Sequence, residues 1–183
     1  EQLGSLRKLS VSESLIDFSS NDYLGFSRSP ELKALYENAL KTYPNYSLGS
    51  TGSRLLAGNS VFTESLESDI AQFHHAEAAL IFNSGYDANV GLLSALAQRN
   101  DTIIADELIH ASMIDGARLS YAKRYTFQHN DLTSLEEKLR HVSGNSYILV
   151  ESIYSMDGDE APLKAICDLA DRYHAAVIVD EAH

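Results

Sequence analysis

Short continuous runs of apolar residues alternate, from about residue 60 onward, with segments in which apolar residues recur every three or four positions. The continuous runs predict strands buried on both faces, and the helical spacing predicts helices that cover them. Alternation of strands and helices is typical of a mostly parallel sheet flanked by helices, so we expect an α/β fold. The expected strands are 79–82, 102–105, 124–127, 147–150 and 176–179.

Helices are expected between these strands, and two of them carry terminal signals. Thr133 and Glu136 have the spacing of a capping box, and Pro162 is placed for the first turn of the last helix. Residues 1–60 fit the alternation less well, and the glycines at 49, 52 and 58 indicate loop. We therefore expect an N-terminal segment over 1–60 and the main domain over 61–183. The expected helices are 30–40, 62–73, 90–96, 111–121, 132–142 and 163–173.

Charge and hydropathy exclude several classes of function. The net charge of −12 argues against a surface for nucleic acid or an anionic membrane, which needs clustered Lys and Arg. No apolar run approaches the ~20 residues that cross a bilayer, so no membrane segment is expected. Cys167 is the only cysteine and lies at an apolar position of a predicted helix, so we expect it to be buried. A single cysteine also favours the cytoplasm.

The residues that follow the predicted strands are candidates for chemistry, because ligands of parallel sheets gather at the carboxyl ends of the strands. They are residues 83–86, 106–110, 151–157 and 180–183. Gly85 stands between a strand and a helix, where the N–H groups of a helix N-terminus can hold a phosphate. A simple turn is the commoner role of such a glycine, so both interpretations stay open.

The last predicted strand is followed by Asp-Glu-Ala-His at residues 180–183. A helicase-like NTPase ends a strand in this way, but it also needs a P-loop with a lysine. Residues 49–54 are glycine-rich and lack that lysine, so this alternative is the weakest, while a plain acidic strand cap stays open. No histidine or cysteine spacing typical of a metal site occurs, so no metal is expected. His110 and His183 differ from the other histidines because both follow predicted strands.

Six short motifs follow one another along the chain, at residues 21–25, 49–59, 84–89, 106–116, 151–159 and 180–183. Together they resemble the α-oxoamine synthases, a family of fold-type I enzymes that use pyridoxal 5′-phosphate (PLP). The resemblance implies a PLP-dependent transferase with an aspartate-aminotransferase-like large domain. Residues 61–183 would be an incomplete PLP-binding large domain, truncated before the small C-terminal domain. The Schiff-base lysine of the family lies further along, and none of the six lysines here stands in a matching motif.

The resemblance implies which residues bind the PLP phosphate and which residue contacts the substrate. The backbone of Gly85 and Tyr86, with Ser84 just before them, would bind the PLP phosphate. Asn21, in the first motif, would contact the substrate.

The resemblance also implies four contacts with the cofactor ring. His110 would stack on the pyridine ring, and Asp180 would pair with the pyridine nitrogen. A carboxylate there favours the protonated ring, which absorbs electrons best. Ser155 and His183 would hydrogen-bond the phenolic oxygen of PLP. His110, Asp180 and His183 are therefore the candidate catalytic residues.

Residues 49–59 are most similar to the biotin-pathway members of the family, the 8-amino-7-oxononanoate synthases. The implied reaction condenses L-alanine with a pimeloyl thioester, carried by CoA or an acyl-carrier protein, with loss of CO2. In the family this loop lies near a dimer interface, so a homodimer is implied. Two alternatives stay open: another α-oxoamine synthase, such as glycine C-acetyltransferase, and a non-catalytic fragment or scaffold.

Overall fold

The computed structural model describes residues 16–43 and 49–183 of the chain. Contacts divide the chain into two units, residues 1–50 and residues 51–183. Residues 51–60 therefore belong to the second unit, and the predicted domain boundary at residue 60 stays a prediction. Within the described residues, no helix is long and apolar enough to cross a membrane.

The described part of the first unit consists of a 3-10 turn, Phe26–Arg28, and one helix, α1, Pro30–Thr42. Ser29 begins the helix, because its hydroxyl accepts a hydrogen bond from the Leu32 N–H at 3.1 Å. The proline in the first turn needs no N–H partner and is already set to a helical φ. The expected helix at 30–40 is confirmed.

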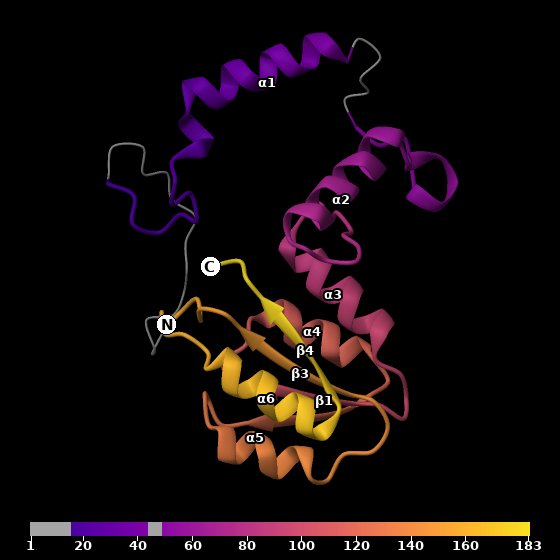
Figure 1. Ribbon diagram of the computed structural model, residues 1–183, viewed down its shortest axis with the longest axis vertical. Helices are drawn as coiled ribbons and strands as arrows, with labels where there is room; N and C mark the ends of the chain where they lie inside the picture. The colour runs from indigo at the N-terminus through magenta and orange to yellow at the C-terminus, as the bar shows by residue number, and fades with distance from the viewer. Residues whose placement is uncertain (1–15, 44–48) are drawn as a thin grey trace, which may run out of the picture. The chain divides into compact units, whose positions relative to one another are not determined.

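The second unit contains the expected alternation of helices and strands (Figure 1). It begins with a single π-helical turn, η2, at Arg54–Gly58. The elements that follow are α2 Val61–Phe73, α3 Gly85–Leu96, β1 Thr102–Asp106, α4 Ala111–Leu119, β2 Lys123–Phe127, α5 Leu132–Leu139, β3 Ser146–Glu151, α6 Leu163–Tyr173 and β4 Ala175–Asp180.

The four strands of this unit form one parallel sheet in the order β2-β1-β3-β4. β1 and β3 lie in the centre and are almost wholly buried, because helices cover both faces of the sheet. The ladder between β3 and β4 begins with Ser146 opposite Ala175 and ends with Glu151 opposite Asp180. The prediction of a parallel α/β sheet flanked by helices is confirmed.

Successive strand residues point to opposite faces of the sheet, and this produces two hydrophobic cores. α5 and α6 cover the face on which Ile104, Ile148 and Val150 lie. α3 and α4 cover the opposite face, on which Ile103 and Leu149 lie. Figure 1 shows these two pairs of helices on either side of the strands.

The strand expected at 79–82 is wrong, because these residues form no strand and lie outside the sheet. A strand needs a neighbouring strand for its backbone hydrogen bonds. The Ile81 N–H instead donates to Glu67 Oε1 at 2.8 Å. Leu80 is 64% exposed, so apolar composition alone overestimates the burial of this segment.

Three local predictions are also wrong. Asp131, rather than Thr133, caps α5, because the Asp131 carboxylate accepts the Thr133 N–H at 2.8 Å. Pro162 is the N-cap of α6 rather than a residue of its first turn. Cys167 is exposed. Ile166 lies on the buried face of α6, and the next residue along the helix, Cys167, lies off that face.

Candidate functional site

The alternation of strand side chains sorts the acidic residues at the carboxyl edge of the sheet onto two faces. Glu151 and Asp180 have the parity of the strand residues that face α3 and α4. Asp106 has the parity of Ile104, which faces α5 and α6. Two other predicted site residues are hydrogen-bonded to the first of these acidic groups: Ser155 directly, and His110 through intervening side chains.

Asp180, at the end of β4, is connected to His110 through two intervening side chains. The Asn89 amide of α3 donates one N–H to Asp180 Oδ2 at 2.7 Å and the other to Ser112 Oγ at 2.9 Å. Ser112 Oγ lies 2.7 Å from His110 Nδ1. The structure therefore brings His110 and Asp180 together in one chain of hydrogen bonds.

The direction of these hydrogen bonds determines where the His110 ring carries its proton. The Ser112 N–H donates to Nδ1 at 3.2 Å. Ser112 Oγ accepts from Asn89, so its own O–H is available to donate to the same ring nitrogen. Nδ1 is thus an acceptor, and neutral His110 carries its proton on Nε2. His110 is exposed, whereas Ser112, which holds its ring through Nδ1, is buried. The imidazole is therefore fixed in position and accessible to a ligand.

Glu151 lies opposite Asp180 in the ladder and is only 3% exposed. Its Oε2 accepts the Ser155 N–H at 3.4 Å. Burial raises the pKa of Glu151 and the Asp180 charge raises it further, while the backbone N–H groups of Ser155 and His110 act in the opposite direction. This buried carboxyl group therefore lies beside Asp180 and accepts a hydrogen bond from the loop that carries Ser155.

The N-terminus of α3 lies one helical turn before Asn89. Ser84 caps the helix, because its hydroxyl accepts the Asp87 N–H at 3.0 Å. Gly85 and Tyr86 are the first two helical residues, and a Cβ on Gly85 would meet no atom within 4 Å. Open space thus adjoins a helix N-terminus, where backbone N–H groups and the helix dipole favour an anion.

The remaining predicted residues are placed at the edges of this arrangement. The Tyr86 phenol donates to Asp115 Oδ2 at 2.5 Å, and this hydrogen bond raises the pKa of Tyr86. Ser155 is exposed in the turn after β3. The Ala182 N–H donates to Asp180 Oδ1 at 2.9 Å, so the chain turns directly after β4. His183 follows this turn. Ligand contacts at these positions stay predictions.

Asn21, the predicted substrate contact, lies in an exposed bend of the first unit. Its role stays a prediction.

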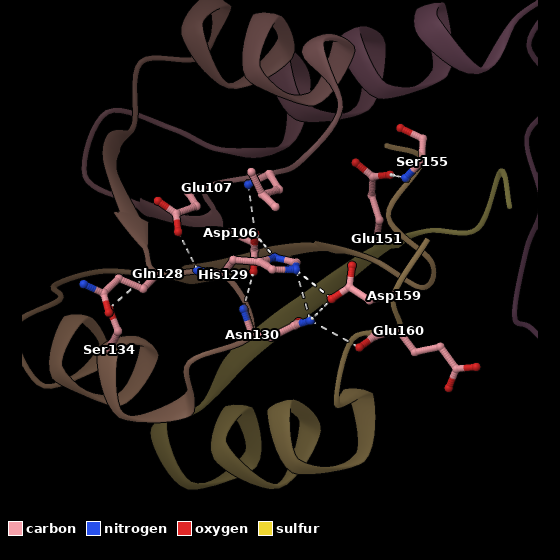
Figure 2. A network of polar contacts seen from close by, with 11 residues as sticks. Asp106, Glu107, Gln128, His129, Asn130, Ser134, Glu151, Ser155, Asp159 and Glu160 are labelled. Atoms are coloured by element: carbon pink, nitrogen blue, oxygen red, sulfur yellow. Dashed lines mark hydrogen bonds and ion pairs between the residues drawn. The ribbon is translucent and has the colours of Figure 1, made fainter. Parts of the chain in front are cut away.

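A second polar cluster lies on the α5 and α6 face of the sheet, with His129 at its centre (Figure 2). His129 Nδ1 is 2.9 Å from Asp106 Oδ1, and Nε2 is 2.8 Å from Asp159 Oδ2. The ring meets the buried Tyr154 ring edge-on at 4.4 Å. Burial raises the pKa of the Tyr154 phenol, which favours its neutral form.

The sequence alone assigns no individual role to Asn89, Ser112, Glu151 or His129, although Glu151 lies in the candidate range 151–157 and a signal exists for each of the four. Asn89 is four positions after Gly85 and so lies on the same side of one helix. Ser112 stands within the motif at 106–116, and Glu151 stands within the motif at 151–159. His129 follows β2, and the rule that polar groups gather after parallel strands applies there as well.

Comparisons with known proteins identify relatives of this chain. Residues 13–183 match the family model described as aminotransferase class I and II. The 8-amino-7-oxononanoate synthase 2 of Bacillus subtilis strain 168 is 48% identical over 168 residues, which cover 91% of this chain and 42% of the relative. The chain spans less than half the length of the curated relatives it matches.

Two solved structures have the same arrangement of elements. A serine palmitoyltransferase from S. paucimobilis, solved with PLP and myriocin bound, gives a TM-score of 0.82 at 33% identity and covers 90% of this chain and 41% of that one. An 8-amino-7-oxononanoate synthase from Francisella tularensis gives a TM-score of 0.73 at 33% identity and covers 94% of this chain and 46% of that one.

Proposed function

The chain belongs to the aminotransferase class I and II family and has the fold of the PLP-dependent transferases, and on this basis we propose that the complete gene product is an α-oxoamine synthase. Its reaction would condense L-alanine with a pimeloyl thioester, giving 8-amino-7-oxononanoate, the free thiol carrier and CO2. Curated relatives that bear the name 8-amino-7-oxononanoate synthase support this choice. Because the chain spans less than half of their length, the activity is proposed for the complete gene product.

The observation that carries the proposal is the hydrogen bond from the Asn89 amide to Asp180 Oδ2. It orients a carboxylate at the end of β4, and the same amide orients His110 through Ser112. One side chain thus fixes the two groups that the family resemblance assigns to the cofactor ring. Each Asp180 oxygen still has lone pairs for a further donor such as a ring N–H.

The residues present fit PLP. The open space beside Gly85, at the N-terminus of α3, suits a phosphate group. The exposed imidazole of His110 suits a flat ring, and the Asp180 carboxylate suits a positively charged ring nitrogen. When bound, PLP supplies an electron-withdrawing ring that takes up the electrons of a bond broken at the amino-acid α-carbon.

In this proposal the residues of the chain bind, orient and protonate. The N–H groups of Gly85 and Tyr86 bind the phosphate, and Asp180 favours a protonated pyridine nitrogen because opposite charge stabilises the positive form. The proton that neutral His110 presents to a ligand is the one on Nε2, because Ser112 occupies Nδ1. The hydroxyl of Ser155 and the ring of His183 contribute hydrogen bonds to the phenolic oxygen.

A second candidate is another acyltransferase of the same family, acting on serine or glycine. The higher TM-score of the serine palmitoyltransferase favours it. The amino acid is selected by the space around its α-carbon, where one methyl group is worth ~1–3 kcal/mol. Direct competition between alanine, glycine and serine therefore decides between the two candidates.

The proposal includes a homodimer. The turn η2 presents Leu55 and Leu56 with 95% and 88% of their surface exposed. Arg54 fixes this turn by pairing with Glu67. Two adjacent leucines held in exposed positions on an anchored turn favour an apolar partner surface, which the family resemblance assigns to a second copy of the chain. A cytoplasmic location, expected from the single cysteine, is also part of the proposal.

Visible absorbance tests the cofactor assignment. We expect the complete gene product to develop an absorbance band in the visible range when it is mixed with PLP. Reduction with borohydride and peptide mapping should then locate PLP on a lysine other than the six of residues 1–183. A protein that develops no band and carries no reduced PLP would contradict the proposal and support a non-catalytic scaffold.

A further inference from the structure

His129 is held between two carboxylates that belong to different segments of the chain (Figure 2). Its Nδ1 is 2.9 Å from Asp106 Oδ1, at the end of β1. Its Nε2 is 2.8 Å from Asp159 Oδ2, in the loop that follows β3. Asp106 is fully buried, whereas the Asp159 side chain is 44% exposed. Each ring nitrogen of His129 therefore faces an acceptor.

This geometry specifies the protonation state of the ring. A neutral imidazole carries one N–H, so one of the two carboxylates would face a nitrogen lone pair. Only the imidazolium form donates to both, and a hydrogen bond between two charged groups is stronger than a neutral one. The pair of distances, both below 3 Å, therefore favours a positively charged His129 between two carboxylates.

The other groups around the ring agree with a positive charge. Glu107 Oε1 accepts the backbone N–H of His129 at 2.9 Å, which adds a third carboxylate nearby. The remaining neighbours are uncharged. The Tyr154 ring packs edge-on. Asn130 Nδ2 lies 3.3 Å from Nε2, but its two N–H groups donate to Asp159 Oδ2 at 2.8 Å and to the Glu160 carbonyl at 3.2 Å, so Asn130 does not need a lone pair on Nε2. Burial alone would lower the pKa of His129, but Asp106 and Asp159 outweigh it, and the pKa is raised.

The segment that His129 holds is the loop at residues 152–160. The loop is closed on itself, since the Tyr154 N–H donates to the Asp159 carbonyl at 3.0 Å and the Gly158 N–H to the Tyr154 carbonyl at 2.8 Å. Asn130 adds a second attachment, because its amide donates to Asp159 Oδ2 at 2.8 Å. Ser155 lies within this closed loop, so we expect a displacement of Asp159 to displace Ser155 as well.

We propose that His129, as an imidazolium, clamps the loop at 152–160 to the end of β2 and is a positioning residue for Ser155. The positioning part rests on the proposed function, because Ser155 is assigned there to the phenolic oxygen of PLP. The clamp itself involves only residues of this chain. The clamp is complete at a pH above the lowered pKa of Asp159 and below the raised pKa of His129, and it is released as pH rises through the pKa of His129.

Ring protonation can be measured directly in the complete gene product with 15N-labelled histidine. At neutral pH we expect both ring nitrogens of His129 to be protonated, and only one in the variant Asp159→Asn, which lacks the second negative charge. The matched control is Asp157→Asn, which removes an exposed carboxylate of the same loop that does not contact His129. A neutral His129 in the unmodified protein would overturn the proposal.

Amide hydrogen exchange tests whether the clamp holds the loop. We expect peptides that cover 152–160 to exchange roughly tenfold faster in Asp159→Asn than in Asp157→Asn, because a charged hydrogen bond is lost. Because the side chain of Asp159 is exposed, we expect this variant to leave the core intact, and His129→Gln provides a second variant. Equal exchange in all these proteins would overturn the clamp.

The pH profile of PLP binding distinguishes positioning from a general structural role. At a pH below the pKa of His129 and above that of Asp159, we expect Asp159→Asn to have a larger dissociation constant for PLP than the unmodified protein. The ratio of the two constants should approach one as pH rises through the pKa of His129. A ratio that does not change with pH would overturn the positioning role. If the unmodified protein binds no PLP, the proposed function fails, and the exchange measurements still decide the clamp.

Discussion

Gly116 of α4 lies directly against Asn89 of α3, so that a Cβ on Gly116 would stand 2.8 Å from the Asn89 carbonyl oxygen. Such a contact is closer than non-bonded atoms tolerate, and the two helices approach each other this closely because residue 116 has no side chain. The close approach places the Asn89 amide 2.9 Å from Ser112 Oγ on α4. Helix packing thus sets the distance on which the site depends.

We therefore expect Gly116→Ala to destabilise the protein, although alanine favours a helix by about 1 kcal/mol over glycine. The added methyl meets backbone that cannot move aside, and overpacking costs ~1–3 kcal/mol. Gly91→Ala in α3 is the matched control, because its Cβ would meet only the ring of Phe82, at 3.1 Å. Urea midpoints should fall for Gly116→Ala relative to Gly91→Ala. Equal midpoints would show that the contact between α3 and α4 is looser than the structure indicates.

Asp180→Asn should leave PLP bound but lower turnover by several orders of magnitude. The amide keeps a hydrogen-bond acceptor, yet it lacks the charge that favours a protonated pyridine nitrogen. Steady-state kinetics of the complete gene product check this. If Asp180 is only an acidic cap at the end of a strand, the loss will be less than about tenfold, since a surface charge contributes little.

Acid should weaken the protein partly through Glu67. Its hydrogen bond to Arg54 lowers the pKa of Glu67 from 4.5 to about 2 in the folded state. A lowered folded-state pKa stabilises the protein above the unfolded value, and this contribution is lost as pH falls from 4.5 towards 2. The difference in urea midpoint between the unmodified protein and Glu67→Gln should therefore shrink across this range. Glu77→Gln, the same substitution at an exposed position, is the control variant.

Leu56→Asp should weaken self-association if η2 contributes to a homodimer. A charged side chain in an apolar contact is left without a partner, and one such change raises a dissociation constant at least about tenfold at an interface centre. Leu119→Asp is the control, because Leu119 is 63% exposed but stands at the end of α4. Sedimentation velocity over a dilution series measures both. Equal dissociation in the two variants would remove η2 from the interface.

Much of the fold follows from the sequence, because buried parallel strands are continuous apolar runs. The runs in β1, β3 and β4 predict their strands to within one residue at either end. The run at 79–82 is also apolar and yet forms no strand, because strand formation depends on a neighbouring strand that composition does not specify. The Ile81 N–H bonds to Glu67 instead.

The candidate site is predictable only in part, for a related reason. Strand ends and the glycine at a helix start can be found along the chain, and they single out Gly85, His110 and Asp180. The groups that connect them cannot be found in this way, because Asn89 reaches Asp180 across 91 positions of sequence. His129 likewise meets Asp159 across 30 positions, and only the folded sheet brings such residues together.

Turnover of the complete gene product, loaded with PLP, is the most direct test of the proposed reaction. The substrates are L-alanine labelled with 13C in its carboxyl group and pimeloyl-CoA, and mass spectrometry follows both products. We expect one labelled CO2 for each 8-amino-7-oxononanoate formed, at a higher rate than glycine with acetyl-CoA or serine with palmitoyl-CoA. Faster turnover of either other pair would contradict the biotin-pathway assignment, and no condensation with any pair would contradict an α-oxoamine synthase altogether.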